Sequence, residues 1–274
     1  MKASPITMQE LKHLVKRVSH ENKPLPFSVL SSFKEQRILN VPILKPLLIV
    51  VLTGVKVLGQ QPEATCASGN FLFLSNSSCA DMRNIPDGEY FAILIEFEVE
   101  DFNQFTCNDA PRLTYFTGTV PETLVKALNQ YVEWSSLTPK ELWHARRKEI
   151  LNLLYLSGHE EIAKISGYPS LSHKLHKIIS EDASNDWSVN YLANKLAVSQ
   201  STLRRKLRAE GGDIKTIVNQ ARMSKALFLV QTTMESIGHI AERCGYKSQS
   251  RFTMKFKSSF GVTPTSLRNT RLRG

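Results

Sequence analysis

The sequence has few cysteines and no apolar run long enough to cross a membrane. Four of its 274 residues are cysteine, without Cys-x-x-Cys spacing or a histidine placed to complete a metal site. They are predicted to be buried, reduced thiols, with pairing of Cys66 and Cys79 as the redox alternative. The most apolar stretch, 46–58, is interrupted by Gly54 and Lys56, whereas a membrane helix needs roughly 20 apolar residues. It predicts a buried strand.

Other absences concern the N-terminus and the acidic residues. Residues 1–17 lack the apolar stretch of a secretory signal, so we expect a cytoplasmic protein without membrane contact. Acidic residues are missing from 246–264. Residues 178–274 contain 16 lysines and arginines against 7 aspartates and glutamates, whereas residues 1–177 contain 19 against 18. This asymmetry predicts a nearly neutral domain joined to one that contacts a polyanion, with a solvated basic surface as the alternative.

Residues 25–118 have the pattern of a β-rich domain. Turn-forming residues separate three runs of β-branched and aromatic residues, at 47–58, 64–75 and 90–99. Glu96, Glu98 and Glu100 alternate with apolar residues, which predicts a strand with one solvated face that reaches residue 100. Several short strands with regular turns predict a sandwich or barrel.

Residues 119–180 change to helical periodicity. Pro121 begins one predicted helix, Thr138 caps a second, and residues 170–180 form a short third. We interpret this segment as a connector or a dimer interface. The polar stretch 181–186 is the predicted domain boundary. The expected fold is α+β, with a β-domain at 1–118, a helical connector at 119–180 and an all-helical domain at 181–274.

The first of two helix-turn-helix patterns follows this boundary. Residues 189–196 form an amphipathic helix, and after a short turn Ser199 caps a second helix that runs to about residue 209. Leu203 and Leu207 are four residues apart and are expected to face the core. The side chains expected on the opposite face and its flank are Ser201, Thr202, Arg204, Arg205 and Arg208.

The second pattern spans residues 236–261. After a turn at 245–247, Ser248 caps a helix with one aromatic face. The residues of that face are Phe252, Phe256 and Phe260. At about 100° per residue, the face pointing away from them carries Ser250, Arg251, Met254 and Lys257, with Lys255 on its flank. We interpret this face as one that reads a DNA groove, rather than as a merely exposed basic surface.

One long helix at 214–233 is predicted to join the two units. Eighteen of its residues, at 1.5 Å each, span roughly 27 Å. With the packing of each unit added, the two recognition helices are expected about 34 Å, or one DNA turn, apart. A single chain would then insert two helices into successive major grooves of double-stranded DNA. Arginines there bond to guanine edges, and lysines contact phosphates.

Several motifs occur in order along this region: QARMSKALFLV, IAERCGY, SQSRF and FKSSFGVTP. With them, residues 187–268 resemble the AraC/XylS family of bacterial transcription regulators, and LRRKLRAEGG is most similar to its subgroup of virulence and acid-resistance regulators. In the family, residues early in each recognition helix read bases. Matched by motif, these are Ser201, Arg204, Arg205, Gln249, Ser250 and Arg251. Met254 departs from this pattern, because it offers only apolar contact, for instance to a thymine methyl group.

The resemblance also implies an N-terminal cupin-like β-barrel that senses a small ligand, followed by helices that dimerise. A metal-dependent cupin needs clustered histidines, and no histidine lies between residues 21 and 143, so we expect no metal there. His173 and His176 lie three residues apart on a predicted helix. They are the remaining metal candidates, against the alternative of ordinary surface residues.

An effector in the N-terminal domain would need an apolar wall, although the same residues suit a core better. These residues are Leu48, Val50, Leu52, Phe71, Phe73, Phe91, Ile93 and Ile95. Some members of the resembled subgroup bind fatty acids, which implies basic residues around the carboxylate. The candidates are Lys45, Lys56 and Arg83. No other cofactor is expected.

The leading hypothesis is a transcription activator that binds DNA through residues 187–268, works with RNA polymerase and is modulated through residues 1–177, with a homodimer as one arrangement. The alternative makes the N-terminal domain a protein-interaction module that answers to a protein partner, without a small ligand. A third class is a DNA-repair enzyme that carries the same helix-turn-helix type. It would need a metal-bound cysteine cluster, which the cysteine spacing does not supply, so no enzyme is expected.

Overall fold

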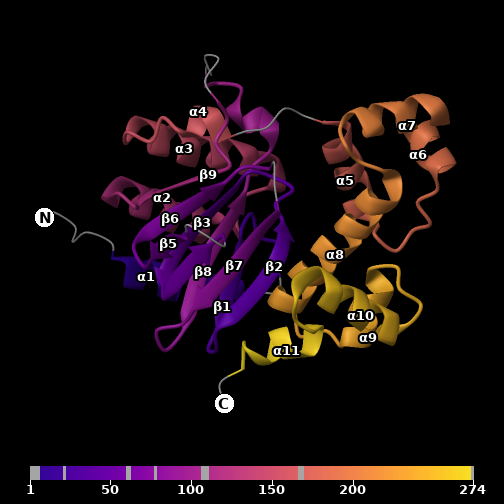
Figure 1. Cartoon of the computed structure of the whole chain (residues 1–274). Coiled ribbons are helices and arrows are strands. Elements are labelled where there is room, and N and C mark those ends of the chain that lie inside the picture. Colours follow the sequence, from indigo (N-terminus) through magenta and orange to yellow (C-terminus); the bar gives the residue numbers. More distant parts are fainter. Residues whose placement is uncertain are drawn as a thin grey trace, which may run out of the picture.

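Two antiparallel sheets form the N-terminal part of the chain (Figure 1). The computed structural model describes residues 7–20, 23–59, 63–76, 79–105, 111–165 and 170–272. One sheet has the strand order β1-β8-β3-β6-β9 and the other has the order β2-β7-β4-β5. The strands are β1 (Ser28–Ser32), β2 (Gln36–Pro42), β3 (Leu47–Thr53), β4 (Val55–Leu58), β5 (Ala64–Ala67), β6 (Asn70–Leu74), β7 (Cys79–Ile85), β8 (Tyr90–Glu96) and β9 (Tyr115–Thr119).

Apolar side chains from both sheets fill the space between them. Ile49 and Val51 of β3 meet Leu58 of β4 and Met82 of β7 in one buried cluster. Because successive residues of a strand point to opposite faces, the residues between them point outward from the sandwich. The predicted α+β class and the predicted sandwich are confirmed.

Three helices cover the outer face of the five-stranded sheet. They are α1 (Met8–Ser19), α2 (Glu122–Trp134) and α3 (Trp143–Leu156), the last preceded by a 3-10 turn at Lys140–Leu142. Leu11, Leu128 and Leu151 contribute one buried residue from each helix to a common core with the sheet. All eight residues of the predicted apolar wall belong to this core and are structural. The helices assigned to a connector therefore bury their apolar faces within their own chain.

The strand predicted to reach residue 100 ends earlier. β8 ends at Glu96, and Val99–Phe102 forms a 3-10 helix. The carboxylate of Asp101 accepts the backbone N–H of Glu98 at 3.0 Å, which caps the turn. Arg147 of α3 donates to the same carboxylate at 3.2 Å. The prediction was wrong because local capping outweighs the alternating pattern here.

The C-terminal part consists of two helical units joined by α8 (Ile214–Thr232). The first unit contains α5 (Leu171–Glu181), α6 (Val189–Lys195) and α7 (Gln200–Ala209), and the short α4 (Ile162–Ile165) precedes it. Leu175 of α5 packs against Leu192 and Leu203 of this unit. Glu210, after α7, accepts the backbone N–H groups of Leu171 and Ser172 at 2.7 and 2.9 Å. The core of the first unit thus includes a helix that lies before the polar stretch 181–186.

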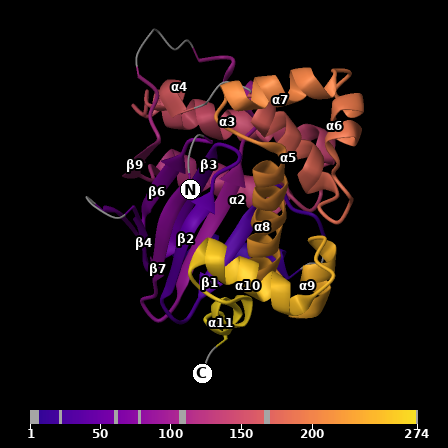
Figure 2. The same ribbon diagram turned by 45° about the vertical axis from the view of Figure 1, so that its right-hand side comes forward.

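The second unit is docked on the sandwich. It contains α9 (Ile237–Arg243), α10 (Gln249–Phe260) and α11 (Pro264–Asn269). Ile38 of β2 is buried in the same cluster as Phe256 and Phe260 of α10. Figures 1 and 2 both show α10 and α11 near β2, with α6 and α7 at the far end of α8. The sandwich therefore packs directly against α10 of the second unit, whereas it contacts the first unit through α5, where His173 lies 2.9 Å from the carbonyl oxygen of Asn76.

Candidate DNA-binding surface and ligand cleft

The helix predicted to be the first recognition helix, α7, turns its basic side chains away from a buried leucine face. Ser199 caps it, since the Ser199 hydroxyl accepts the N–H of Thr202 at 3.1 Å. Leu203 and Leu207 have no solvent exposure. The predicted DNA-contacting side chains on this helix are all exposed, namely Ser201, Arg204, Arg205 and Arg208.

The helix predicted to be the second recognition helix, α10, repeats this construction with an aromatic face. Its three phenylalanines are buried, and neighbouring rings lie 5.8 and 4.8 Å apart between centroids. The Ser248 hydroxyl accepts the N–H of Arg251. The predicted contact residues are all exposed, namely Gln249, Ser250, Arg251, Met254, Lys255 and Lys257. Met254 is 63% exposed, so its apolar side chain is available to a partner.

The turns of the two units use the same backbone conformation with different residues. The residue after the C-cap is left-handed in both, with φ of 52° at Ala197 and 76° at Gly245. A Cβ atom at residue 245 would lie 2.9 Å from the carbonyl oxygen of Ala183, so glycine fits there. Ala197 adopts this conformation at a cost of about 1 kcal/mol.

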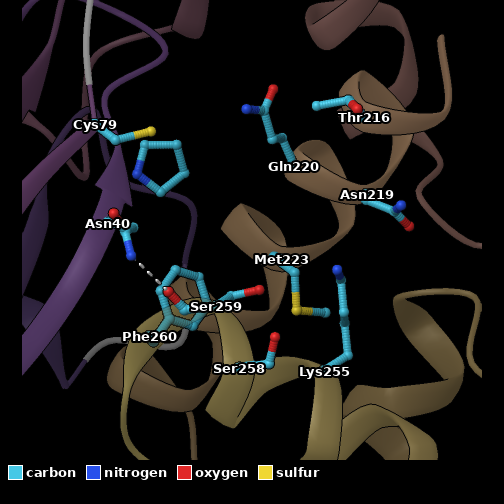
Figure 3. A pocket seen from close by; sticks show the side chains of 11 residues that line it. Asn40, Cys79, Thr216, Asn219, Gln220, Met223, Lys255, Ser258, Ser259 and Phe260 are labelled. Atoms are coloured by element: carbon cyan, nitrogen blue, oxygen red, sulfur yellow. Dashed lines mark hydrogen bonds between the residues drawn. The ribbon is translucent and has the colours of Figure 1, made fainter. Parts of the chain in front are cut away.

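Not all of the predicted contact residues stand on the outermost surface. Arg204 and Arg208 border a hollow of about 240 Å³ beside Lys215 at the start of α8. Lys255 lines a polar pocket of about 300 Å³ whose walls are the sandwich rim, α8 and α10 (Figure 3). Within it the Asn40 amide donates to the carbonyl oxygen of Ser259 at 3.5 Å, drawn as a dashed line. These three basic residues therefore flank the recognition faces.

The sequence analysis missed Gln200. This residue is exposed at the start of α7, as Gln249 is at the start of α10, and its amide donates to Asn190 of α6 at 3.2 Å. The signal was present in the sequence, because Ser-Gln-Ser occurs at 199–201 and again at 248–250. Gln200 therefore joins the candidate surface.

A two-lobed cleft separates the sandwich from α5 and α8. The inner lobe, of about 150 Å³, is mainly apolar, and the outer lobe, of about 640 Å³, is bordered by charged residues. Both lobes share the residues Leu44, Lys45, Glu96, Ser224 and Phe228. The Ser224 hydroxyl and the Nε2 atom of His176 are buried here, without a hydrogen-bond partner among the described residues. The cleft thus has an inner end lined mainly by apolar residues and an outer end lined by both apolar and charged residues.

Lys56 contributes a buried cation to the inner lobe. Its side chain is 1% exposed, and its ammonium donates to Asn84 Oδ1 at 2.8 Å. Within the described part of the chain, no carboxylate forms an ion pair with it. Burial lowers the pKa of Lys56 from 10.5 to about 8, so the side chain is mostly charged at neutral pH. A buried cation without a counter-ion favours an anion beside it.

The other two predicted ligand contacts differ from Lys56. Lys45 borders both lobes but is already paired, with Glu98 at 2.7 Å and Glu96 at 3.8 Å. Arg83 pairs with Glu35 at 3.0 Å and borders neither lobe. The structure therefore brings Lys45 and Lys56 to the cleft and leaves Arg83 outside it.

The histidines and cysteines in the described parts of the chain differ in burial and contacts. Among the described residues, no group of three potential ligands is arranged to hold a metal ion. His176 is buried, which lowers its pKa to about 4, and His173 contacts the carbonyl oxygen of Asn76 at 2.9 Å. Cys66 is a buried free thiol, as predicted. Cys79 is exposed, contrary to the prediction that the cysteines are buried. Cys107, which was also predicted to be buried, lies outside the described residues. Within the described ranges, no helix is long and apolar enough to span a membrane.

Sequence comparisons with known proteins each cover a part of the chain. Residues 192–270 match the family described as "Helix-turn-helix domain". The transcriptional regulator GadX of Escherichia coli is 33% identical over 97 residues, 35% of each chain. The transcriptional activator CfaD of Escherichia coli is 33% identical over 42% of this chain and 46% of its own. The transcriptional regulator SirC of Salmonella typhimurium is 38% identical over 35% of this chain and 33% of its own. The chain thus matches a third to a half of the length of these relatives, of which GadX and SirC are named regulators and CfaD an activator.

The fold as a whole is similar to solved structures of ToxT from Vibrio cholerae. One of them, described as bound to an unsaturated fatty acid, has a TM-score of 0.64 and covers 91% of this chain and 96% of its own. The sequence identity is 15%, so the similarity concerns the fold alone. It extends over the sandwich and both helix-turn-helix units.

Proposed function

Because the chain belongs to the AraC/XylS family of bacterial transcription regulators, we propose that it activates transcription by inserting α7 and α10 into successive major grooves. The observation that carries this proposal is the repeated construction of the two helices. Each has a serine cap, a buried apolar face and exposed basic side chains that include at least one arginine. CfaD, one of the relatives, is named an activator. The partners are double-stranded DNA and RNA polymerase, in the bacterial cytoplasm.

The side chains of the two helices have different roles in this proposal. Arg205 and Arg251 bond to guanine edges, since a guanidinium forms two parallel bonds with the O6 and N7 atoms. Lys255 and Lys257 contact phosphates and fix the register on the duplex. Met254 packs on a thymine methyl group. The remaining contacts come from Gln200, Ser201, Arg204, Arg208, Gln249 and Ser250.

Alanine substitutions test this assignment. A binding site is first obtained by in vitro selection of random duplexes with the purified protein. Arg205→Ala and Arg251→Ala should each weaken binding to it by about 1–3 kcal/mol, and the base preference should relax at one position. Lys126→Ala, at an exposed position on α2, is the matched control and should leave binding unchanged. Unchanged affinity in both arginine variants would remove the groove assignment.

We further propose that an apolar acid occupies the cleft and modulates DNA binding. The inner lobe suits an apolar chain, and its buried cation suits a carboxylate. ToxT, which has this fold, is described as bound to an unsaturated fatty acid. The carboxylate would contact Lys56 from within the sandwich or Lys45 where the two lobes meet. Arg83 has no part in this site.

Native mass spectrometry tests the ligand. The protein mixed with oleate should retain one molecule, and Lys56→Met should lose most of it if the carboxylate lies at the inner end. Lys45→Met should instead lose most of the bound oleate if the carboxylate lies where the two lobes join. Binding that is the same in both variants and in the Lys126→Met control would contradict a carboxylate site in the cleft.

A second proposal for the N-terminal domain is contact with a protein partner or a second copy of the chain. It is favoured by exposed apolar residues near the hairpin of α2 and α3, where Trp134 is 52% exposed and Leu137 73% exposed. Sedimentation of the wild type and of Trp134→Ser decides between monomer and homodimer. If oleate does not bind and this surface associates, the protein-module alternative replaces the ligand.

A further inference from the structure

One transverse row of polar side chains crosses the inner side of the four-stranded sheet and ends on the DNA-binding domain. Lys56 of β4 pairs across strands with Asn84 of β7, which pairs with Gln36 of β2. The Lys56 ammonium donates to Asn84 Oδ1 at 2.8 Å, and the Asn84 amide donates to Gln36 Oε1 at 2.8 Å. The Gln36 amide then donates to the Thr270 hydroxyl at 2.7 Å, at the end of α11.

The direction of the hydrogen bonds in this row is fixed from both ends. An ammonium can only donate, so Asn84 must present its oxygen to Lys56. The single hydroxyl proton of Thr270 goes to the carbonyl oxygen of Leu267 at 2.6 Å, so this oxygen can only accept from Gln36. Because Lys56, Asn84 and Gln36 are at most 3% exposed, water does not readily replace a lost partner.

The backbone of Thr270 also forms hydrogen bonds with the turn between β1 and β2. Its carbonyl oxygen accepts the backbone N–H groups of Phe33 at 2.8 Å and Lys34 at 3.2 Å. Leu267, one turn earlier, is buried in the core of the second helix-turn-helix unit. Thr270 is therefore the point at which this unit is tied to the sandwich by both main-chain and side-chain bonds.

We propose that the row Lys56–Asn84–Gln36–Thr270 is a latch that holds the second helix-turn-helix unit on the sandwich and transmits the state of the cleft to it. Lys56 and Asn84 both border the inner lobe. An anion beside Lys56 changes the bond that orients Asn84, and the change passes through Gln36 to α11. This transmission rests on the proposed ligand function, whereas the latch itself does not.

Amide hydrogen exchange measures the latch directly. Asn84→Asp keeps an acceptor for Lys56 but removes the donor to Gln36. Gln36 must then donate to the new carboxylate and turn its oxygen toward Thr270, where no proton is available. We expect exchange in peptides spanning 30–36 and 262–272 to become about 2- to 10-fold faster, as for the loss of one net hydrogen bond. Asn70→Asp, on β6 of the other sheet, is the matched control and should exchange as the wild type does.

Two substitutions at the far end of the row separate the latch from general destabilisation. Thr270→Val removes the hydroxyl and should accelerate exchange in both peptides, whereas Thr270→Ser retains it and should restore wild-type rates. If Thr270→Val accelerates exchange but Asn84→Asp does not, the row does not transmit and the proposal is overturned. Equal rates in Thr270→Val and wild type would also overturn it.

Oleate tests the transmission separately. It should change exchange at 262–272 in the wild type and leave it unchanged in Thr270→Val, with equal binding to both by native mass spectrometry. Binding with the same exchange response in both proteins would refute the transmission. No binding to either protein would refute the proposed ligand, while the substitutions alone would still decide whether the latch exists.

Discussion

Replacing Lys56 with methionine should stabilise the protein at neutral pH by an amount that shrinks as the pH rises. The folded chain holds the ammonium in the sandwich interior, and burial lowers the pKa of Lys56 from 10.5 to about 8. At about 1.4 kcal/mol per pKa unit, the charged form costs the folded state about 3 kcal/mol. Methionine has a similar length and no charge, so it removes this cost.

The sign of the pH dependence follows from proton binding in the two states. Below pH 8 the folded and unfolded chains both bind the Lys56 proton, so the wild type bears the full cost. Between pH 8 and 10.5 the folded chain loses this proton while the unfolded chain keeps it, and wild-type stability rises. Methionine does not titrate. The advantage of the variant should therefore fall by about 3 kcal/mol across this interval.

Urea unfolding of both proteins at pH 7, 8, 9 and 10 measures this difference. In the variant the Asn84 Oδ1 atom loses its hydrogen-bond donor, which lowers the free energy of unfolding by about 1–3 kcal/mol at every pH. This loss shifts the difference in stability between the two proteins but does not change its dependence on pH. Lys45→Met, at a half-exposed lysine, is the control and should show no comparable trend. A Lys56→Met difference that is the same at pH 7.5 and pH 10 would refute the reasoning.

Three further predictions concern the helical units. Ala197→Gly should raise the free energy of unfolding by about 1 kcal/mol, because it relieves a left-handed alanine, whereas Gly245→Ala should lower it by more than that, as denaturant melts would measure. Phe256→Ala should cost about 3–5 kcal/mol in the same melts, because the ring is fully buried between the second unit and β2. Glu210→Ala should lower the free energy of unfolding by about 1 kcal/mol and speed hydrogen exchange of the first amides of α5. Unchanged hydrogen exchange at these amides would contradict the capping role of Glu210.

The helix-turn-helix units were predictable because their determinants are local. A serine cap, apolar residues four apart and a turn residue fall within some twenty residues of one another, and these signals fixed α6, α7, α9 and α10. The local pattern also misled in one place. Glu96, Glu98 and Glu100 alternate as in a strand, yet the capping carboxylate of Asp101 turns the chain.

The features that the sequence did not reveal depend on distant contacts. The sequence analysis recognised the eight apolar strand residues. It did not predict that α1, from before the strands, and α2 and α3, from after them, would cover these residues. Lys56 was a candidate for its charge, whereas its neighbours Asn84 and Gln36 lie 28 and 20 residues away on other strands and carry no local signal. Cross-strand register decides such a row, and one sequence does not specify register over that distance.

The spacing of the two half-sites tests the central claim, which is that one chain reads two successive major grooves. On a duplex obtained by in vitro selection, the two protected segments should lie about one turn, or 10 base pairs, apart. Inserting 5 base pairs between them should turn the second segment to the opposite face of the DNA and reduce affinity as far as removing that segment does. Arg251→Ala should then cost nothing further on the expanded site. Equal affinity for the original and expanded duplexes would contradict the account.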